Sequence, residues 1–198
     1  APQTSDSYPA VTAVLVVCNE QDNVIKKLDN LFALDYPQDK FQVIVVDDAS
    51  TDSTIESILA YHSDRVRLLK APQREGKSNG LNRALAEVTT ELALMVDARQ
   101  TLAPDALKFL SAWFSDAQYG LVSGELCFRS EDENGFSQGM DAYWRYEKAI
   151  RKAEASIASV PGVTGAIYLM RTAAFQPIPA DTLIDDVLIP MNAIKAGY

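Results

Sequence analysis

The amino-acid sequence predicts an α/β domain with a mainly parallel central sheet flanked by helices. Short apolar, β-branched segments alternate along the chain with segments of helical pattern, which is the order that builds parallel sheets. The first of these segments, VTAVLVV at 11–17, is apolar throughout, as strands buried on both faces are. The 198 residues, 47% of them hydrophobic, provide enough material for one buried core.

The expected elements begin with the strand at 11–17, a helix over 23–34 and, after the turn YPQDK, a strand at 41–46. Residues 50–53, STDS, are of types that favour helix starts, so the next helix is expected to follow them and to end near Tyr61. Four further strands are expected, at 65–70, 92–96, 121–128 and 166–170. Further helices are expected at 78–88, after Pro104, over 136–158 and within 182–198.

Composition and charge exclude several classes of protein. A net charge of −9 and a pI near 4.6 argue against nucleic acid as a partner, and no apolar segment approaches the ~18 residues of a membrane span. The first residues lack the basic and apolar parts of a signal peptide. We expect a loose tail at 1–10 and one soluble domain at 11–198, excised from a longer protein. Cys18 and Cys127 are expected to be reduced thiols, not a disulfide or metal site.

Polar residues follow three of the expected strands at the point where each strand ends. In open α/β sheets, ligands bind beyond the carboxyl ends of the strands, so these residues are candidates for one site. Any single acid among them has a turn or helix-cap role as its alternative. The pairs are Asn19 and Glu20 after the first strand, Asp47 and Asp48 after the second, and Asp97 and Arg99 after the strand at 92–96.

The stretch REGKSNGLNRAL at 74–85 places Lys77 at or just before a helix start, where the helix dipole disfavours a cation. A negatively charged ligand at that end would reverse the effect. Gly80 lies inside the same helix and costs ~1 kcal/mol relative to alanine, which predicts close packing against its backbone. The alternative is a solvated lysine beside a packing glycine.

A nucleoside-triphosphate loop is a second interpretation of this region. The pattern from Ala71 to Gly76, Lys77 and Ser78 fits the looser form of that loop, and LALMVD would be its acid-ended strand. Against it, Pro72 removes a backbone donor and Glu75 would point negative charge at the phosphates. The segment also follows the third strand, whereas such loops normally follow the first.

The stretch TLIDDVLIPMNAIKAGY at 182–198 contains adjacent acids, Asp185 and Asp186. Neighbouring residues on a helix point about 100° apart, so the two cannot address one pocket in the same way. We expect one of them to cap the helix and the other to face inward. Pro190 removes a helix hydrogen bond, so the helix is expected to start late or to bend there.

Taken in order, these segments resemble the family 2 glycosyltransferases of the nucleotide-sugar-binding GT-A fold. The resemblance runs from Val11 to Tyr198 and is closest to bacterial membrane-anchored members that build surface or cell-wall polysaccharides. It implies a full-length protein at the bacterial cytoplasmic membrane, with this domain facing the cytoplasm. The stretches that carry it are VLVVCNEQDNV, VIVVDDASTDST, REGKSNGLNRAL, LMVDARQ, VTGAIYLMR and IDDVLIPM.

The resemblance also implies roles for individual residues. Asp97 matches the first acid of the family's Asp-x-Asp motif and would bind Mg²⁺ or Mn²⁺, and Asp186 would be the general base. The remaining implied roles are Asn19 and Glu20 lining the nucleotide pocket, Asp47 and Asp48 at the uracil and ribose, Lys77 near the base and diphosphate, and Gly165, Ala166 and Asp185 on the acceptor side.

Arg99 stands where the family's motif has its second acid. An arginine can meet phosphate with two parallel hydrogen bonds and so do part of a metal ion's work. Alternatively, Arg99 turns outward and Asp97 holds the metal with phosphate oxygens and waters. A third interpretation is that Arg99 pairs with Asp97 and braces the loop.

The implied reaction is inverting transfer of a hexosyl or N-acetylhexosaminyl group from a nucleotide sugar, expected to be a UDP-sugar. The acceptor would be a hydroxyl of a growing polysaccharide, cell-wall or lipid-linked saccharide.

The family's Gln-x-x-Arg-Trp motif does not occur here, so the fragment is expected to turn over slowly or only to bind nucleotide. The helix expected at 141–156 combines aromatic and basic residues. This helix could form a face for the acceptor or for a membrane surface. The alternative is that its aromatic residues pack on the sheet while its basic residues lie in water. A non-catalytic nucleotide-binding module is the remaining alternative.

Overall fold

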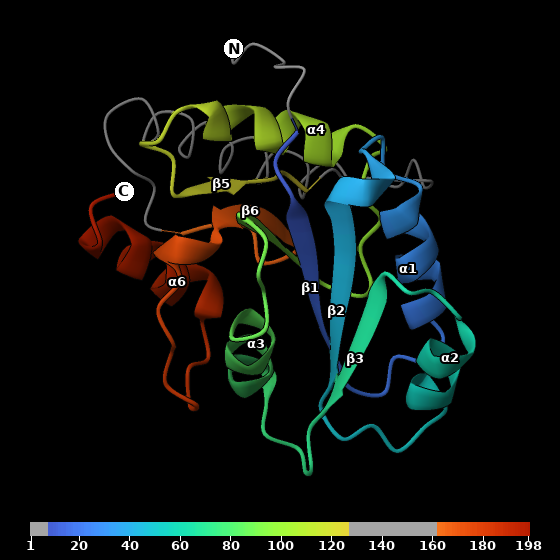
Figure 1. Ribbon diagram of the computed structural model, residues 1–198. Helices are drawn as coiled ribbons and strands as arrows, with labels where there is room; N and C mark the ends of the chain where they lie inside the picture. The colour runs from blue at the N-terminus through green and yellow to red at the C-terminus, as the bar shows by residue number, and fades with distance from the viewer. Residues whose placement is uncertain (1–7, 127–161) are drawn as a thin grey trace, which may run out of the picture.

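The computed structural model describes residues 8–126 and 162–198 (Figure 1). The predicted helices at 136–158 and 141–156 lie outside the described residues. The strands are β1 (Val11–Val17), β2 (Phe41–Asp47), β3 (Val66–Lys70), β4 (Leu92–Val96), β5 (Leu121–Ser123) and β6 (Ile167–Arg171). The α-helices are α1 (Val24–Phe32), α2 (Thr54–Ala60), α3 (Lys77–Leu85), α4 (Ala106–Ser111) and α6 (Asp185–Lys195). Short 3-10 helices occupy Gln38–Lys40, Ala112–Ser115 and Thr172–Ala174.

The strands form one sheet in the order β3-β2-β1-β4-β6-β5. Strands β1 to β4 pair in parallel, whereas β6 runs antiparallel to both β4 and β5. The predicted α/β class with a mainly parallel sheet is therefore confirmed. The strand order reverses direction between β1 and β4, and the carboxyl ends on either side of such a reversal are where ligands bind in this class of fold.

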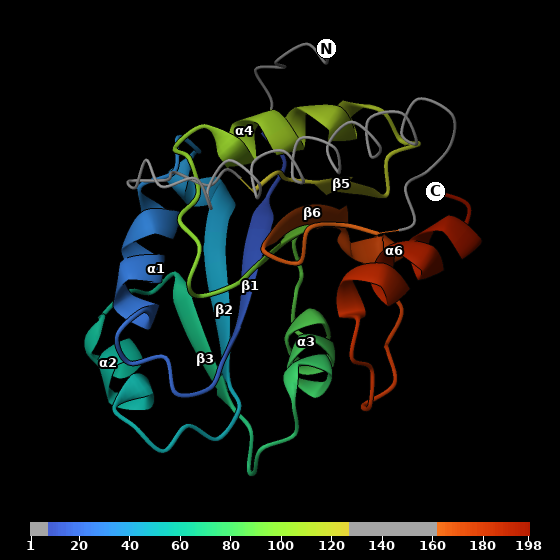
Figure 2. The ribbon, with the colours of Figure 1, turned by 180° about the vertical axis from the view of Figure 1, so that it is seen from behind.

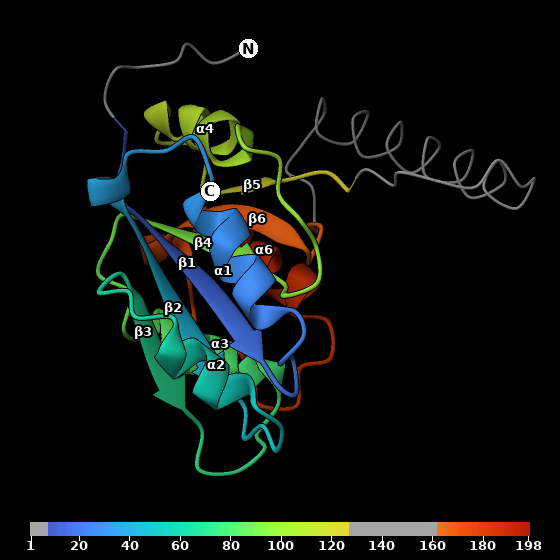
Figure 3. The same cartoon turned by 90° about the vertical axis from the view of Figure 1, so that its right-hand side faces the viewer.

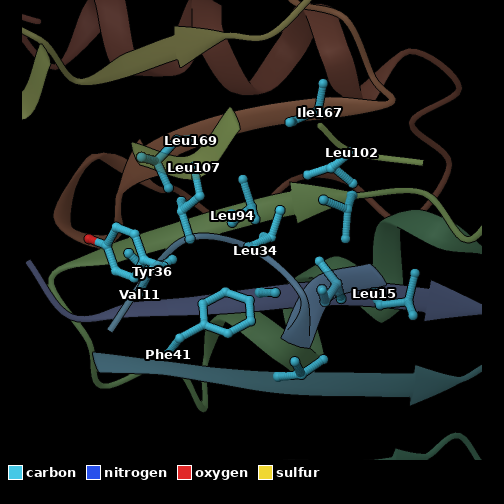
Figure 4. Close-up of a cluster of buried hydrophobic side chains, with 14 of the residues drawn as sticks. Val11, Leu15, Leu34, Tyr36, Phe41, Leu94, Leu102, Leu107, Ile167 and Leu169 are labelled. Carbon is cyan, nitrogen blue, oxygen red and sulfur yellow. The ribbon is translucent and has the colours of Figure 1, made fainter. Parts of the chain in front are cut away.

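Helices cover both faces of the sheet, with a separate hydrophobic cluster under each set. On one face, Val11, Leu15 and Leu94 pack with residues of α1 and α4 (Figure 4). On the other face, Val14 and Ile44 pack with residues of α3 and α6. Figure 3 shows α1 in front of the sheet and α3 behind it, and Figure 2 shows α6 beside α3. This two-faced burial explains why the central strands are apolar throughout.

Several elements are shorter than the sequence indicated. The predicted strand at 121–128 ends at Ser123, and the predicted helix at 23–34 is α1 at Val24–Phe32. The predicted helix after STDS is α2, which begins directly after it at Thr54, and the side chains of Ser50 and Asp52 also bind the loop that follows β1. Within the described residues, no helix has the length and hydrophobicity needed to cross a bilayer.

Gly80 confirms the prediction of close packing on α3. A Cβ atom built at this position would lie 2.6 Å from Cγ1 of Val16 on β1. Real Cβ atoms do not approach so closely, so only glycine lets α3 settle onto the sheet here. The start of α3, which carries Lys77, is thereby held near the carboxyl end of β1.

At the amino end of the sheet, the rings of Tyr8 and Tyr36 pack edge to face, with 5.1 Å between their centroids.

Candidate functional site

The loops after β1 and β2 hold each other in an unusual backbone conformation. Asn19 and Ala49 have φ angles of 56° and 54°, in the left-handed region that non-glycine residues rarely adopt. The Asn19 amide donates to Oγ of Ser50 at 2.9 Å, and the Thr51 amide donates to Oδ1 of Asn19 at 2.8 Å. The two strand ends therefore form one rigid unit. Such strain tends to be concentrated at functional sites.

Asp47 and Asp48 are buried carboxylates at the end of β2. Asp48 is 4% exposed, and its two oxygens accept the backbone amides of Glu75 at 2.7 Å and Gly76 at 2.9 Å. Asp48 thus fixes the turn that leads into α3. Asp47 is fully buried, and one of its oxygens accepts the Ser50 amide at 3.0 Å. Its other oxygen, Oδ1, has no hydrogen-bond partner among the described residues, which is uncommon for a buried acceptor.

The same hydrogen bonds count against the nucleoside-triphosphate loop. A phosphate cradle needs free backbone amides, but those of Glu75 and Gly76 point at Asp48. Gly76 has a φ of 85° and forms the turn directly before Lys77. The segment 71–76 is therefore built as a turn around a buried carboxylate, and the triphosphate-loop interpretation is not supported.

Lys77 lies at the centre of the site and joins three elements. From the first residue of α3, its Nζ lies 3.3 Å from Oδ1 of Asp97, after β4, and 3.4 Å from Oδ2 of Asp185, on α6. Partial burial opposes the charge on Lys77, but the carboxylates of Asp97 and Asp185 outweigh it and raise the pKa above the usual lysine value. Lys77 therefore stays protonated. Its unfavourable place at a helix start is offset by these two carboxylates.

Gly165 and Ala166 lie between Asp97 and Asp186. The Asp97 amide donates to the Ala166 carbonyl at 3.4 Å. A Cβ atom built on Gly165 would lie 3.4 Å from Oδ2 of Asp186, so the Asp186 side chain lies against the Gly165 backbone. The residues predicted for the acceptor side thus adjoin the residues predicted for the diphosphate.

Both acids at the start of α6 lie in its first turn, and neither caps it. The N-cap position is Ile184, without a side-chain cap hydrogen bond, so the prediction that one of the acids caps the helix is wrong. Asp185 is 8% exposed and faces Lys77. Of the two alternatives expected for Pro190, a late start is excluded, because α6 runs from Asp185 through Pro190.

Pro190 explains how α6 is tied to the segment that leads into β6. Proline has no backbone N–H, so the carbonyl of Asp186, four residues earlier, lacks its helical partner. That carbonyl accepts the Val163 amide at 2.9 Å instead. The hydrogen bond fixes the segment containing Gly165 against the first turn of α6, where Asp186 lies.

Arg99 pairs with Glu20, not with Asp97. Its Nε and a terminal nitrogen each lie 2.8 Å from Oε1 of Glu20, and its side chain is 72% exposed. Glu20 is held in turn by the side-chain amide of Asn23 at 2.7 Å. The structure therefore contradicts one of the three interpretations of Arg99, namely that it pairs with Asp97. Arg99 lies at the rim, where a phosphate group could replace Glu20 as its partner.

Two buried polar residues next to the site were not predicted from the sequence. Tyr168 on β6 is 1% exposed, its hydroxyl has no hydrogen-bond partner among the described residues, and burial together with the charge of Asp185 raises its pKa. Lys27 on α1 is 2% exposed. A signal for Lys27 was available, because it lies on the helical face defined by Val24, Leu28 and Leu31, where an apolar residue is expected. No comparable signal marks Tyr168, because tyrosine is common in buried strands.

The donor set fits a divalent metal only in a limited way. Among residues 8–126 and 162–198, no three His, Cys, Asp or Glu side chains are grouped to hold a metal ion. Asp97 would supply one carboxylate, and its side chain is 38% exposed. Mg²⁺ is commonly held by one or two carboxylates while phosphates and waters complete its shell. Asp97 fits that mode of binding, in which the ligand supplies most of the oxygens.

Comparison with known sequences establishes the family. The model described as "Glycosyl transferase family 2" matches residues 12–178, which is most of the chain. The chain belongs to glycosyl transferase family 2. The predicted family is therefore confirmed, whereas the roles of the individual residues stay predictions.

Curated relatives of this family 2 domain include enzymes that make glycolipids and polysaccharides. A beta-monoglucosyldiacylglycerol synthase of Synechocystis is 29% identical over 154 residues, which are 72% of this chain and 32% of that protein. A poly-beta-1,6-N-acetyl-D-glucosamine synthase of Staphylococcus aureus is 24% identical over 200 residues, which are 98% of this chain and 48% of that protein. The chain thus spans less than half the length of these relatives.

Solved structures with the same fold include two glycosyltransferases. The mannosyltransferase PcManGT from Pyrobaculum calidifontis, in complex with GDP-Man and Mn²⁺, has a TM-score of 0.84 and 30% identity. The match covers 100% of this chain and 55% of that one. A TarS fragment from S. aureus in complex with UDP-GlcNAc has a TM-score of 0.63 and 19% identity, covering 93% of this chain and 53% of that one. These likenesses confirm the predicted GT-A fold.

Proposed function

We propose that this domain transfers a sugar from a nucleoside-diphosphate sugar to an acceptor hydroxyl, with inversion at the anomeric carbon. One observation carries the proposal: Lys77 is held between Asp97 and Asp185 at the carboxyl ends of the strands, in a family 2 domain. A diphosphate placed there would meet the charged side chain of Lys77, and Asp185, the carboxylate expected on the acceptor side, lies next to that side chain. Family membership supports the reaction class, and the geometry supports the place.

The nucleoside would bind over the joined ends of β1 and β2. Asn19 and Glu20 would line its pocket, and Asp47, buried at the end of β2, would support the loop beneath it through the Ser50 amide. Asp48 would act through the turn at 75–76 that it fixes, below the nucleoside. Uridine is the nucleoside expected from the sequence. The GDP-Man complex of the similar mannosyltransferase makes guanosine the second candidate.

The diphosphate would lie against Lys77 and Arg99. Two opposite charges about 4 Å apart interact by ~4 kcal/mol at an effective dielectric near 20, so each cation can contribute appreciably to binding. Both are already paired with carboxylates, which the phosphate groups would have to displace. Mg²⁺ or Mn²⁺ at Asp97 would add positive charge to the leaving diphosphate. The Mn²⁺ complex of the similar mannosyltransferase supports this choice of metals.

Asp186 would be the general base. It would take the proton of the acceptor hydroxyl while the new C–O bond forms at the anomeric carbon. The bond from that carbon to the diphosphate oxygen breaks in the same step. Proton removal by a positioned base is typically worth 10²–10⁴-fold. Gly165 supports this role, because the absence of a side chain leaves Asp186 open on the side where the acceptor would enter.

The acceptor would be a saccharide or a lipid-linked saccharide. The names of the relatives, a glucosyldiacylglycerol synthase and a poly-N-acetylglucosamine synthase, support a glycolipid or polysaccharide product. We accordingly place the full-length protein at the bacterial cytoplasmic membrane, with this domain on the cytoplasmic side and membrane contacts made by other parts of the protein.

Ligand binding tests the donor. UDP, GDP, their sugars and ATP, each with and without Mn²⁺, are titrated into the domain by calorimetry. We expect binding of one diphosphate class with its sugar, strengthened by Mn²⁺. Binding of ATP without binding of UDP or GDP would contradict the proposal.

Turnover of the whole protein tests the base and separates an enzyme from a binding module. Asp186→Asn is expected to retain nucleotide binding and to lose product formation by at least about 10²-fold. Asp181→Asn, an exposed acid shortly before α6, is the matched control and is expected to act as wild type. Equal turnover of the two variants would remove Asp186 from the role of base.

A further inference from the structure

Lys27 is a buried charge with a defined partner. It lies on the inner face of α1, is 2% exposed, and its Nζ donates to the backbone carbonyl of Gln100 at 2.8 Å. Lysine is almost never fully buried unless it is paired. Burial lowers the pKa of Lys27 to about 8, although the charge of Asp97 acts in the opposite direction. The ammonium group is therefore still mostly charged at neutral pH.

Stability alone does not account for this charge. Removing an ammonium group from water is costly, and replacing a buried ionic group by an apolar one of similar size is often neutral or stabilising. The neighbours of Lys27 on its helical face, Val24, Leu28 and Leu31, are fully buried apolar residues, as the hydrophobic core requires. A methionine at 27 would continue that face. The lysine is explained better by what it holds.

What Lys27 holds is the loop after β4, which begins with Asp97 and contains Arg99. Side chains from the β1–α1 segment anchor this loop at three successive points. Glu20 pairs with Arg99, and Lys27 donates to Gln100. Asn30 then exchanges two hydrogen bonds with the backbone of Leu102, at 2.8 and 3.0 Å. Beyond them, the Leu102 side chain is buried in the core (Figure 4). The loop is thus fixed along its length.

We propose that Lys27 is a positioning residue of the donor site: by holding the Gln100 carbonyl it keeps Asp97 and Arg99 turned toward the diphosphate. The charge of Lys27 also attracts the phosphates from the protein interior, where charges are weakly screened. Lys27 itself does not touch the donor. Because the loop matters only if it faces a donor diphosphate, this role rests on the function proposed above.

Lys27→Met tests the role, with Lys26→Met as the matched control, because Lys26 is the adjacent lysine on the exposed face of the same helix. Binding of UDP and GDP is measured by calorimetry beside that of uridine and guanosine, which lack the phosphates. For Lys27→Met we expect diphosphate affinity to fall about tenfold, with nucleoside affinity unchanged and the unfolding midpoint no lower than in wild type. Lys26→Met is expected to match wild type in all three measurements. Lys27→Arg, which keeps the charge, is expected to restore part of the diphosphate affinity.

Asn30→Ala provides a second route, because it loosens the same loop without removing a charge, and the same selective loss is expected. The role is refuted if Lys27→Met binds diphosphates as tightly as Lys26→Met does. It is also refuted if nucleoside binding, diphosphate binding and the unfolding midpoint all fall together, because that pattern indicates a structural role only. A wild-type chain that binds none of these ligands instead refutes the donor site itself, before any variant is compared.

Discussion

Replacing Lys77 by methionine removes a side chain that connects Asp97 to Asp185. The separations of 3.3 and 3.4 Å correspond to about 5 kcal/mol for each pair at an effective dielectric near 20. The side chains of Lys77 and Asp97 are 43% and 38% exposed, so solvent screens much of this attraction. We therefore expect a net loss of only ~1–2 kcal/mol for a bound diphosphate, equivalent to roughly 5–30-fold in affinity. In the variant, two carboxylates would face the phosphates with no cation between them.

Isothermal titration with UDP and GDP at low and high salt measures this loss. Lys108→Met is the matched control, because Lys108 also forms an exposed ion pair, 3.1 Å from Asp35, but at a distance from the site. We expect the difference between the two variants to shrink as ionic strength rises, and uridine or guanosine to bind both equally. If Lys77→Met binds diphosphates as tightly as Lys108→Met at low salt, the site is not organised around Lys77.

Three further predictions concern stability, each measured by urea denaturation. Gly80→Ala is expected to cost ~1–3 kcal/mol in spite of alanine's better helix propensity, because its Cβ would collide with Val16; an unchanged midpoint would contradict the packing. Ala49→Gly is expected to stabilise the domain by ~1 kcal/mol by relieving the positive φ, whereas Ala60→Gly, at the exposed end of α2, should destabilise it. Burial lowers the pKa of Lys27 to about 8, below the roughly 10.4 of an unfolded lysine, so the unfolded state binds more protons between those values. Wild type should therefore gain up to ~3 kcal/mol relative to Lys27→Met as the pH rises from about 8 to about 10.4, and a difference that does not change with pH would contradict this burial.

The central strands could be predicted from the sequence because burial on both faces leaves a continuous apolar signal. The residues at the strand ends could be grouped because parallel strands deliver their carboxyl ends to one edge of a sheet. Gly80 was predictable because its cost in a helix requires a compensating contact. The antiparallel direction of β6 was not predictable, because an apolar run such as AIYLM is the same whichever way the strand is paired.

The contacts that define the site depend on side chains that meet only after folding. The family resemblance implied a role for Asp48 at the nucleotide, but the sequence could not show that both oxygens of Asp48 accept the backbone amides of Glu75 and Gly76. The prediction that Asp185 or Asp186 caps α6 failed because the helix already begins at Asp185, with Ile184 at the N-cap position. Asp185 instead faces a long-range partner, Lys77. Lys27 shows the opposite case: a charge on an apolar helical stripe is visible in the sequence, but only the fold shows which carbonyl it binds.

An acidic protein that binds an anionic donor needs positively charged side chains at the binding site, and they must stay protonated there. The net charge is −9, yet Lys77 is held protonated by Asp97 and Asp185, whose charges outweigh the effect of its partial burial. The two carboxylates that keep Lys77 charged are also its competitors for phosphate. Because Asp97 is the more exposed of the two, a cation or a donor group that engages Asp97 would release Lys77 toward the diphosphate while Asp185 still supports its charge. Donor affinity should then depend on Asp97 mainly through the state of Lys77, and the loss caused by Asp97→Asn should be smaller in a Lys77→Met background than in wild type.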